Sequence, residues 1–144
     1  MVAAQQVNPT AAISIDLVAA SDTPDIHGGN AVKVGSGPVV GTYTFHGRGT
    51  LNGLIPHPRL LSLVEESAKS QKVDLQRHAT IGLLTDASYV QLVGEGVACV
   101  DVAWPTRYTH SGVEVCSLDD LEQLKKLLIG VVEKFSPEEN FSRG

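Results

Sequence analysis

Short apolar runs separated by turn residues fill most of the chain, and the composition of each run predicts the element that it forms. The runs rich in Val, Ile and Thr predict buried strands, because β-branched side chains pack well on a pleated sheet. One of them (AAISIDLV) is interrupted by a single acid, Asp16. Pro105 follows the last of these runs and is expected to stop the strand. The predicted strands are residues 11–18, 39–45, 74–81 and 97–104.

Two longer stretches show the helical spacing of apolar positions. Pro58 opens the first, since proline is favoured at the first position of a helix. Ser117 begins the second, and Ser117 with Asp120 has the spacing of a capping box. Thr85 is expected to cap a shorter helix over residues 86–92. The apolar stripes consist of Leu60, Leu61, Val64 and Ala68 in the first helix and of Leu121, Leu124, Leu128, Val131 and Phe135 in the second.

The alternation of strands and helices predicts an α/β fold, in which a mixed sheet is flanked by helices. Turn-rich segments at residues 21–29 and 35–38 are expected to be loops. A chain of 144 residues fits one domain and can bury a substantial core. We therefore predict one domain over residues 1–136 and a polar, frayed tail over residues 137–144. No helix is predicted before the first strand.

The charge balance narrows the classes of partner. Sixteen acidic residues outnumber 11 basic ones, the net charge is −5, and no basic stripe is present. This argues against a nucleic-acid or anionic-membrane surface. Cys99 and Cys116 do not form a CxxC pair, and this usage fits a reducing cytoplasm. We expect no signal peptide, and no apolar run reaches the roughly 20 residues that span a bilayer.

Two residues stand out as candidates for chemistry. Asp16 interrupts an apolar strand, where an acid is costly to desolvate unless it is paired or binds a metal. Capping of a neighbouring loop is the alternative explanation. His110 lies in the segment PTRYTHS, which follows a strand, and ligands of α/β sheets bind at the carboxyl ends of strands. A solvent-exposed loop histidine is the alternative there.

The other polar residues are less informative. Asp86 is explained by the helix dipole that it would stabilise, and Asp101 by an edge or paired position in its strand. Cys99 is too isolated to be assigned as a nucleophile. Gly35 and Gly37 do not form a GxGxxG phosphate loop. The histidines without metal-ligand spacing, which we expect in loops or at the surface, are His27, His46, His57 and His78.

Three motifs occur in a fixed order along the chain. They are Asp16 in its strand followed by Asp22-Thr23-Pro24 and Gly35-Ser36-Gly37-Pro38, then Thr85-Asp86-Ala87, and then PTRYTHS (105–111) with Glu114 and Asp119-Asp120-Leu121-Glu122. Together, from the start of the chain to about Phe135, they resemble the glutamyl-aminopeptidase or tetrahedral-aminopeptidase family of dinuclear metallopeptidases, some of which are labelled cellulase M.

The resemblance implies an activity and a ligand set. Family members are cytoplasmic exopeptidases that use two divalent ions, zinc or cobalt, and often assemble as dodecamers built from dimers. Asp16 matches a ligand of one ion and His110 a ligand of the other. The general base and the remaining ligands are expected upstream, so no catalytic residue is assigned and the substrate-binding residues stay unknown. The chain would be the C-terminal part of a metallo-aminopeptidase catalytic domain, inactive alone.

Three departures from the family pattern accompany the resemblance. Leu83-Leu84 stands where Gly-Gly is usual, Asp25 replaces a Gly, and Gly112 replaces a Pro. The first puts a backbone contact to substrate in question, and none affects Asp16 or His110. A non-catalytic α/β module for binding or assembly is the alternative function. Carbohydrate hydrolysis, prompted only by the cellulase label, would need a carboxylate pair roughly 5–10 Å apart.

Overall fold

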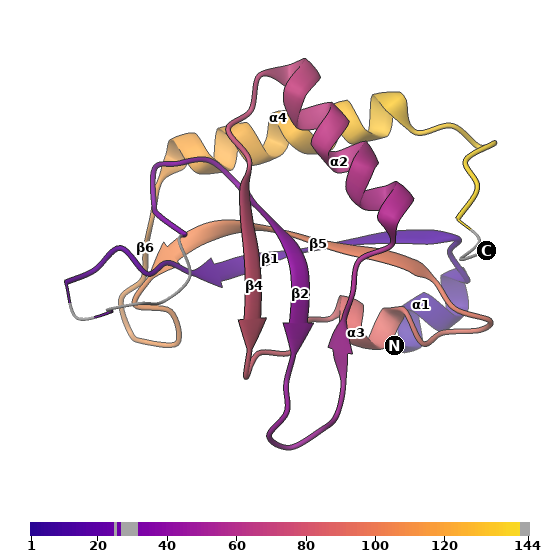
Figure 1. Cartoon of the computed structure of the whole chain (residues 1–144), viewed down its shortest axis with the longest axis horizontal. Coiled ribbons are helices and arrows are strands. Elements are labelled where there is room, and N and C mark those ends of the chain that lie inside the picture. The colour runs from indigo at the N-terminus through magenta and orange to yellow at the C-terminus, as the bar shows by residue number, and fades with distance from the viewer. Residues whose placement is uncertain (25, 27–31, 142–144) are drawn as a thin grey trace.

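A six-stranded sheet forms the centre of the computed structural model, which describes residues 1–24, 26 and 32–141 (Figure 1). The helices lie on both of its faces, so the predicted α/β fold with a mixed, helix-flanked sheet is confirmed. The strands are β1 (Ala11–Ala19), β2 (Val39–Phe45), β3 (Gly53–Leu54), β4 (Gln76–Ile81), β5 (Ala98–Arg107) and β6 (Val115–Cys116). The helices are α1 (Val2–Val7), α2 (Pro58–Gln71), α3 (Ala87–Val90) and α4 (Leu118–Lys134).

Parallel and antiparallel pairs are mixed in this sheet. β1 runs parallel to β5 along its whole length, from Ala11 opposite Ala98 to Ala19 opposite Thr106. β5 is antiparallel to β2, and β2 is parallel to β4. Because β1 and β5 are parallel neighbours, their carboxyl ends lie at the same edge of the sheet.

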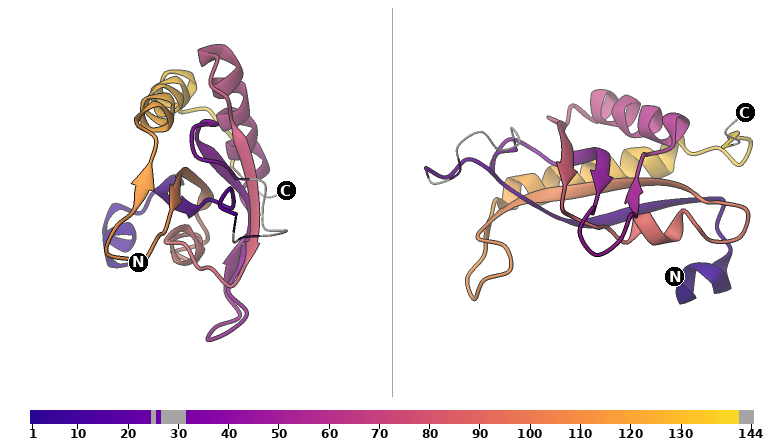
Figure 2. Two further views of the ribbon diagram at one scale, coloured as in Figure 1. Left: turned by 90° about the vertical axis from the view of Figure 1, so that its left-hand side faces the viewer. Right: turned by 60° about the horizontal axis from the view of Figure 1, so that its bottom comes forward.

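One face of the sheet is covered by α2 and α4, which pack side by side (Figure 2). Val100 and Val102 of β5 point toward these helices, and Leu127 of α4 is fully buried against them. Burying a Leu or Val side chain contributes about 1.5–3 kcal/mol, so this layer holds most of the apolar stabilisation. The buried members of the cluster are Val40, Leu60, Leu63, Val64, Ala68, Val73, Val100, Val102, Leu124, Leu127 and Val131.

The opposite face is covered only in part, by α1 and α3 (Figure 2). Ala87 of α3 joins a small cluster with Leu54 and Cys99, and Val18 with Val39 belongs to another. α1 buries none of its own residues. The part of this face that the helices leave open carries polar side chains.

β5 continues through Pro105, where the sequence predicted its end. The N–H of Ala98 donates to Thr10 on the β1 side, and backbone groups alternate along a strand, so Pro105 faces away from β1. On that side Ala103 pairs with β2 and Thr106 with β6. Pro105 falls between these two pairings, where its missing N–H breaks no ladder bond.

The helix starts also differ in detail from the predictions. Ser117 is the N-cap residue of α4, but it makes no side-chain capping bond, so the capping box is wrong. α3 is shorter than the predicted helix, and its N-cap residue is Asp86. The hydroxyl of Thr85 donates instead to Asp101. The short elements α1, β3 and β6 were not predicted.

The described part of the C-terminal tail is held against the domain, so the expectation of a frayed tail is wrong there. Glu139 accepts hydrogen bonds from Nε and Nη2 of Arg59 at 2.7 and 2.6 Å. The ring of Phe141 stacks on Phe135 and meets His57 edge-on. These contacts fold the chain back over the start of α2.

Candidate functional site

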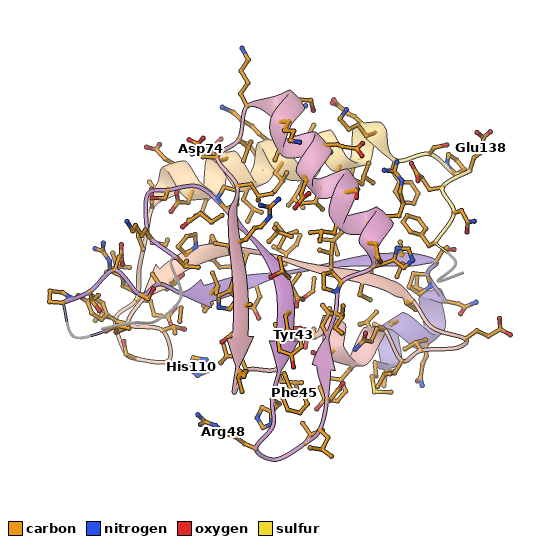
Figure 3. All side chains as sticks on the ribbon, viewed as in Figure 1. Tyr43, Phe45, Arg48, Asp74, His110 and Glu138 are labelled. Atoms are coloured by element: carbon orange, nitrogen blue, oxygen red, sulfur yellow. The ribbon has the colours of Figure 1, made fainter. Side chains whose placement is uncertain are left out.

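The two metal-ligand candidates belong to the same edge of the sheet. Asp16 is exposed on β1, opposite Ala103 of β5. His110 lies in the loop after β5, clear of α2 and α4 (Figure 3). Asp16 Oδ1 accepts the N–H of its neighbour Leu17 at 2.7 Å. Among the residues that the structure describes, neither Asp16 nor His110 has an ion-pair partner, so both side chains can accept a ligand.

The loop that carries His110 has an unusual backbone that is fixed at both ends. Tyr108 and His110 have φ angles of 61° and 63°, a left-handed conformation uncommon for residues other than glycine. At its base, Arg107 donates to both oxygens of Asp22, at 2.8 and 2.6 Å. Further along, Glu114 accepts the N–H of His110 at 2.7 Å. Strain of this kind concentrates at functional sites.

Asp22 ties together the loops that follow β1 and β5. It lies after β1, whereas Arg107 is the last residue of β5. Its Oδ2 atom also accepts the N–H of Val34 at 3.1 Å. The hydrogen-bonded Arg107 guanidinium lowers the pKa of Asp22 from its ordinary value of 3.8. The pair therefore stays charged at neutral pH and fixes the position of one loop relative to the other.

A second carboxylate fixes the Gly-Ser-Gly-Pro loop. Asp120, fully buried at the start of α4, accepts the N–H of Gly35 at 2.7 Å and that of Gly37 at 2.8 Å. Gly37 has a φ of +90°, and a Cβ there would lie 1.8 Å from the carbonyl oxygen of Asp74. Only glycine fits this position. The acidic motif at the start of α4 thus holds a loop instead of capping its own helix.

A cavity of about 50 Å³ lies beside Asp16, on the face of the sheet away from α2 and α4. Its walls include Ser14 from β1, Asp101 from β5 and His78 from β4, and Thr85 from the loop before α3. No Lys or Arg among the described residues lines it. The cavity is therefore polar and acidic at one end.

Asp101 is the most perturbed acid in this cavity. It is 8% exposed, and its Oδ2 atom accepts the hydroxyl of Thr85 at 2.8 Å. Burial raises the pKa of Asp101 from 3.8 to about 6, and the nearby carboxylates of Asp16 and Asp86 add to the rise. The sequence left this residue open between an edge position, a paired position and a functional one, and it is buried with one hydrogen bond to Thr85.

Two histidines expected in loops or at the surface are buried, so that expectation is wrong for them. His57 is 3% and His78 6% exposed. Burial lowers the pKa of His78, so its ring is neutral near pH 7. Strand alternation is the signal that could have found it, because Arg77 pairs with Glu65 of α2 and the next side chain must face the other way. His27 lies outside the described residues.

The two candidates form only part of a metal site. Within the described ranges, no group of three or more His, Cys, Asp or Glu side chains could hold a metal ion. The same part of the chain contains no helix long and apolar enough to cross a membrane.

The comparisons with known proteins agree on one family. A family model described as M42 glutamyl aminopeptidase matches residues 1–127. SgcX of Escherichia coli K12 is 40% identical over 124 residues, which cover 86% of this chain and 33% of SgcX.

Solved structures share the fold over nearly the whole chain. An aminopeptidase from the archaeon Desulfurococcus kamchatkensis has a TM-score of 0.87 and 32% identity, covering 95% of this chain and 38% of that one. PhTET1-12s, described as a dodecamer, has a TM-score of 0.71 and 28% identity, covering 92% of this chain and 37% of that one. The chain thus spans little more than a third of the length of these proteins.

Proposed function

The chain belongs to the M42 glutamyl aminopeptidase family, and from this premise we propose that it forms part of the catalytic domain of a metal-dependent aminopeptidase. The reaction is hydrolysis of the N-terminal residue from a peptide. One observation carries the proposal: Asp16 and His110, the expected metal ligands, belong to adjacent parallel strands that end at the same edge of the sheet. Such edges collect ligands in α/β folds.

The residue types fit two divalent ions, zinc or cobalt. Carboxylate oxygen and imidazole nitrogen are both common zinc ligands, so Asp16 would hold one ion and His110 the other. A pair of such ions acidifies a bridging water and polarises the scissile carbonyl. The ion pair of Asp22 with Arg107 would keep the loop of His110 in place relative to β1.

We expect the chain to be inactive by itself. A catalytic zinc is held by about three protein ligands, whereas the described residues include no group of three that could bind a metal ion. The general base and the remaining ligands are expected in the part of the family fold that this chain does not match. No catalytic residue is therefore assigned to this chain.

The proposal extends to assembly and location. PhTET1-12s is a dodecamer, and we propose a dodecamer built from dimers for the whole protein. Cys99 and Cys116 are both free, which supports a reducing cytoplasm as the location. The acidic balance of the chain supports peptide rather than nucleic acid or membrane as its partner.

Zinc calorimetry on the chain tests the ligand assignment. We expect weak binding that is lost in Asp16→Asn and in His110→Ala, because each removes one ligand atom. His46→Ala, which removes a histidine from another loop, is the control. Zinc binding that is unchanged in both ligand variants would sink the assignment.

Hydrolysis of leucine- and glutamyl-p-nitroanilide, with added zinc or cobalt, tests the expected inactivity. The chain should release no p-nitroaniline above the rate of metal in buffer. Turnover that disappears in His110→Ala would show that the chain is itself an active peptidase and would overturn this part of the proposal.

A further inference from the structure

Four strands bring small or polar residues into one row, on the face of the sheet away from α2 and α4. Ser14 of β1 lies opposite Asp101 of β5. The antiparallel register of β5 with β2 continues to Gly41, which lies against Asp101. Gly41 in turn lies opposite His78 of β4. Asp101 and His78 therefore flank a glycine.

Gly41 leaves the space between its two polar neighbours open. A Cβ at Gly41 would lie 3.2 Å from Cβ and 3.7 Å from Oδ2 of Asp101. The Asp101 side chain thus leans over the glycine. Asp101, Gly41 and His78 all line the cavity of about 50 Å³ that Asp16 also lines. The cavity extends from the exposed metal-ligand candidate to two buried polar side chains.

Each of these buried side chains has an atom with no hydrogen-bond partner among the described residues. They are Oδ1 of Asp101 and Nε2 of His78, on residues that are 8% and 6% exposed. A buried polar atom without a partner costs about 1–3 kcal/mol, and a charged one costs more. Such atoms in native structures are satisfied by water or by a ligand.

The charges around the cavity favour a cation. Asp16, Asp86 and Asp101 interact electrostatically, and no described Lys or Arg offsets them in the lining. A carboxylate and the free nitrogen of a neutral imidazole both accept hydrogen bonds, and a primary ammonium brings three donors. The cavity is larger than the roughly 30 Å³ that one water occupies in the liquid.

We propose that this cavity binds the side-chain ammonium of a peptide's N-terminal residue, so that the enzyme prefers N-terminal lysine or ornithine. Asp101 Oδ1 and His78 Nε2 accept the ammonium hydrogens, and the alkyl part of the side chain passes Leu83 at the mouth. The inference rests on the proposed function, because Asp16 marks the place where a metal holds the N-terminal residue. It assigns Asp101 as a specificity-determining residue.

A titration of the metal-free chain at pH 7.5, followed by NMR, compares L-lysinamide with L-norleucinamide. Norleucinamide has the same carbon chain without the terminal nitrogen. We expect lysinamide to bind at least about tenfold more tightly, the effect of one hydrogen bond to a charged group. The largest shifts should occur at the amides of Thr85, Asp101 and His78. Equal affinities, or no binding, would mean that the cavity holds water only and would overturn the proposal.

Asp101→Asn removes the charge but keeps the size of the side chain and an oxygen for Thr85. It should abolish the preference for lysinamide and leave norleucinamide binding unchanged. Asp74→Asn, which removes an exposed carboxylate on the side of α2 and α4 (Figure 3), should leave the preference intact. A preference that persists in Asp101→Asn overturns the proposal.

Gly41→Ala tests the shape of the cavity without changing a charge. The added methyl group would crowd Asp101 and narrow the cavity, so lysinamide affinity should fall at least about tenfold while circular dichroism confirms the fold. Unchanged affinity in this folded variant would place the ligand elsewhere and overturn the proposal.

The two proposals fail separately. Zinc binding that ignores Asp16 and His110 would sink the peptidase assignment while a lysinamide preference carried by Asp101 still stands. Zinc binding that needs both residues, without any lysinamide preference, would sink only the cavity assignment.

Discussion

Replacing Asp101 by Asn should stabilise the chain at alkaline pH. The buried carboxyl has a pKa of about 6 in the fold against an ordinary 3.8, a difference that corresponds to roughly 3 kcal/mol once the group is ionised. Asn cannot ionise, and it keeps an oxygen for the hydroxyl of Thr85, which lies 2.8 Å from the carboxylate. The substitution therefore removes the cost of a buried charge.

The sign of the effect follows from proton uptake. Because the pKa of Asp101 is raised in the folded state, the folded chain holds this proton between about pH 4 and 6 while the unfolded chain has released it. The stability of the wild type relative to Asp101→Asn therefore falls as the pH rises through that window. Above about pH 6 the full difference is present.

Urea unfolding in buffer with a chelator, at pH 4 and at pH 8, measures this difference. The free energy of unfolding of Asp101→Asn relative to the wild type should increase by about 3 kcal/mol between the two pH values. The value at pH 4 reports only the hydrogen bonds that the amide changes. Asp74→Asn controls for loss of an exposed carboxylate. A difference that is the same at both pH values would refute the reasoning.

Three further substitutions test the scaffold. Asp120→Ala leaves two buried N–H donors without an acceptor and should cost about 3–5 kcal/mol in urea unfolding, whereas Asp119→Ala, at an exposed neighbour, should cost far less. Asp22→Asn should lower stability at pH 7 by about 1–2 kcal/mol, and because the pKa of Asp22 is lowered, this loss should shrink below about pH 4. Leu127→Ala should cost about 2–5 kcal/mol through a core cavity. Ile129→Ala, at a half-exposed position of the same helix, is its control. A loss at Ile129 equal to that at Leu127 would contradict the assigned core.

The main elements of the fold could be predicted because their signals are local. The run Val-Val-Gly-Thr-Tyr-Thr-Phe gave the bounds of β2 correctly, and Pro58 marked the start of α2. The end of β5 was missed at Pro105, because tolerance of a proline depends on which neighbouring strand its nitrogen faces. The two-residue strands β3 and β6 were missed because each exists only through pairing with a distant partner.

The candidate site was predicted less completely, for the same reason. Asp16 and His110 were found through motifs, and their role as metal ligands stays a prediction. The partners that build their surroundings are far apart in sequence, since Asp22 meets Arg107 across 85 residues and Asp120 meets Gly35 across 85. No local pattern encodes such contacts.

The division of the sheet into an apolar and a polar face separates two demands on the sequence. Robustness of the scaffold is set by positions such as Leu127 beneath the helices, whereas ligand choice is set by Asp101 and His78 on the other side. Libraries confined to the polar row should therefore yield many folded variants with new preferences. Selection for heat resistance alone would, in contrast, tend to erase Asp101, because its buried charge opposes folding.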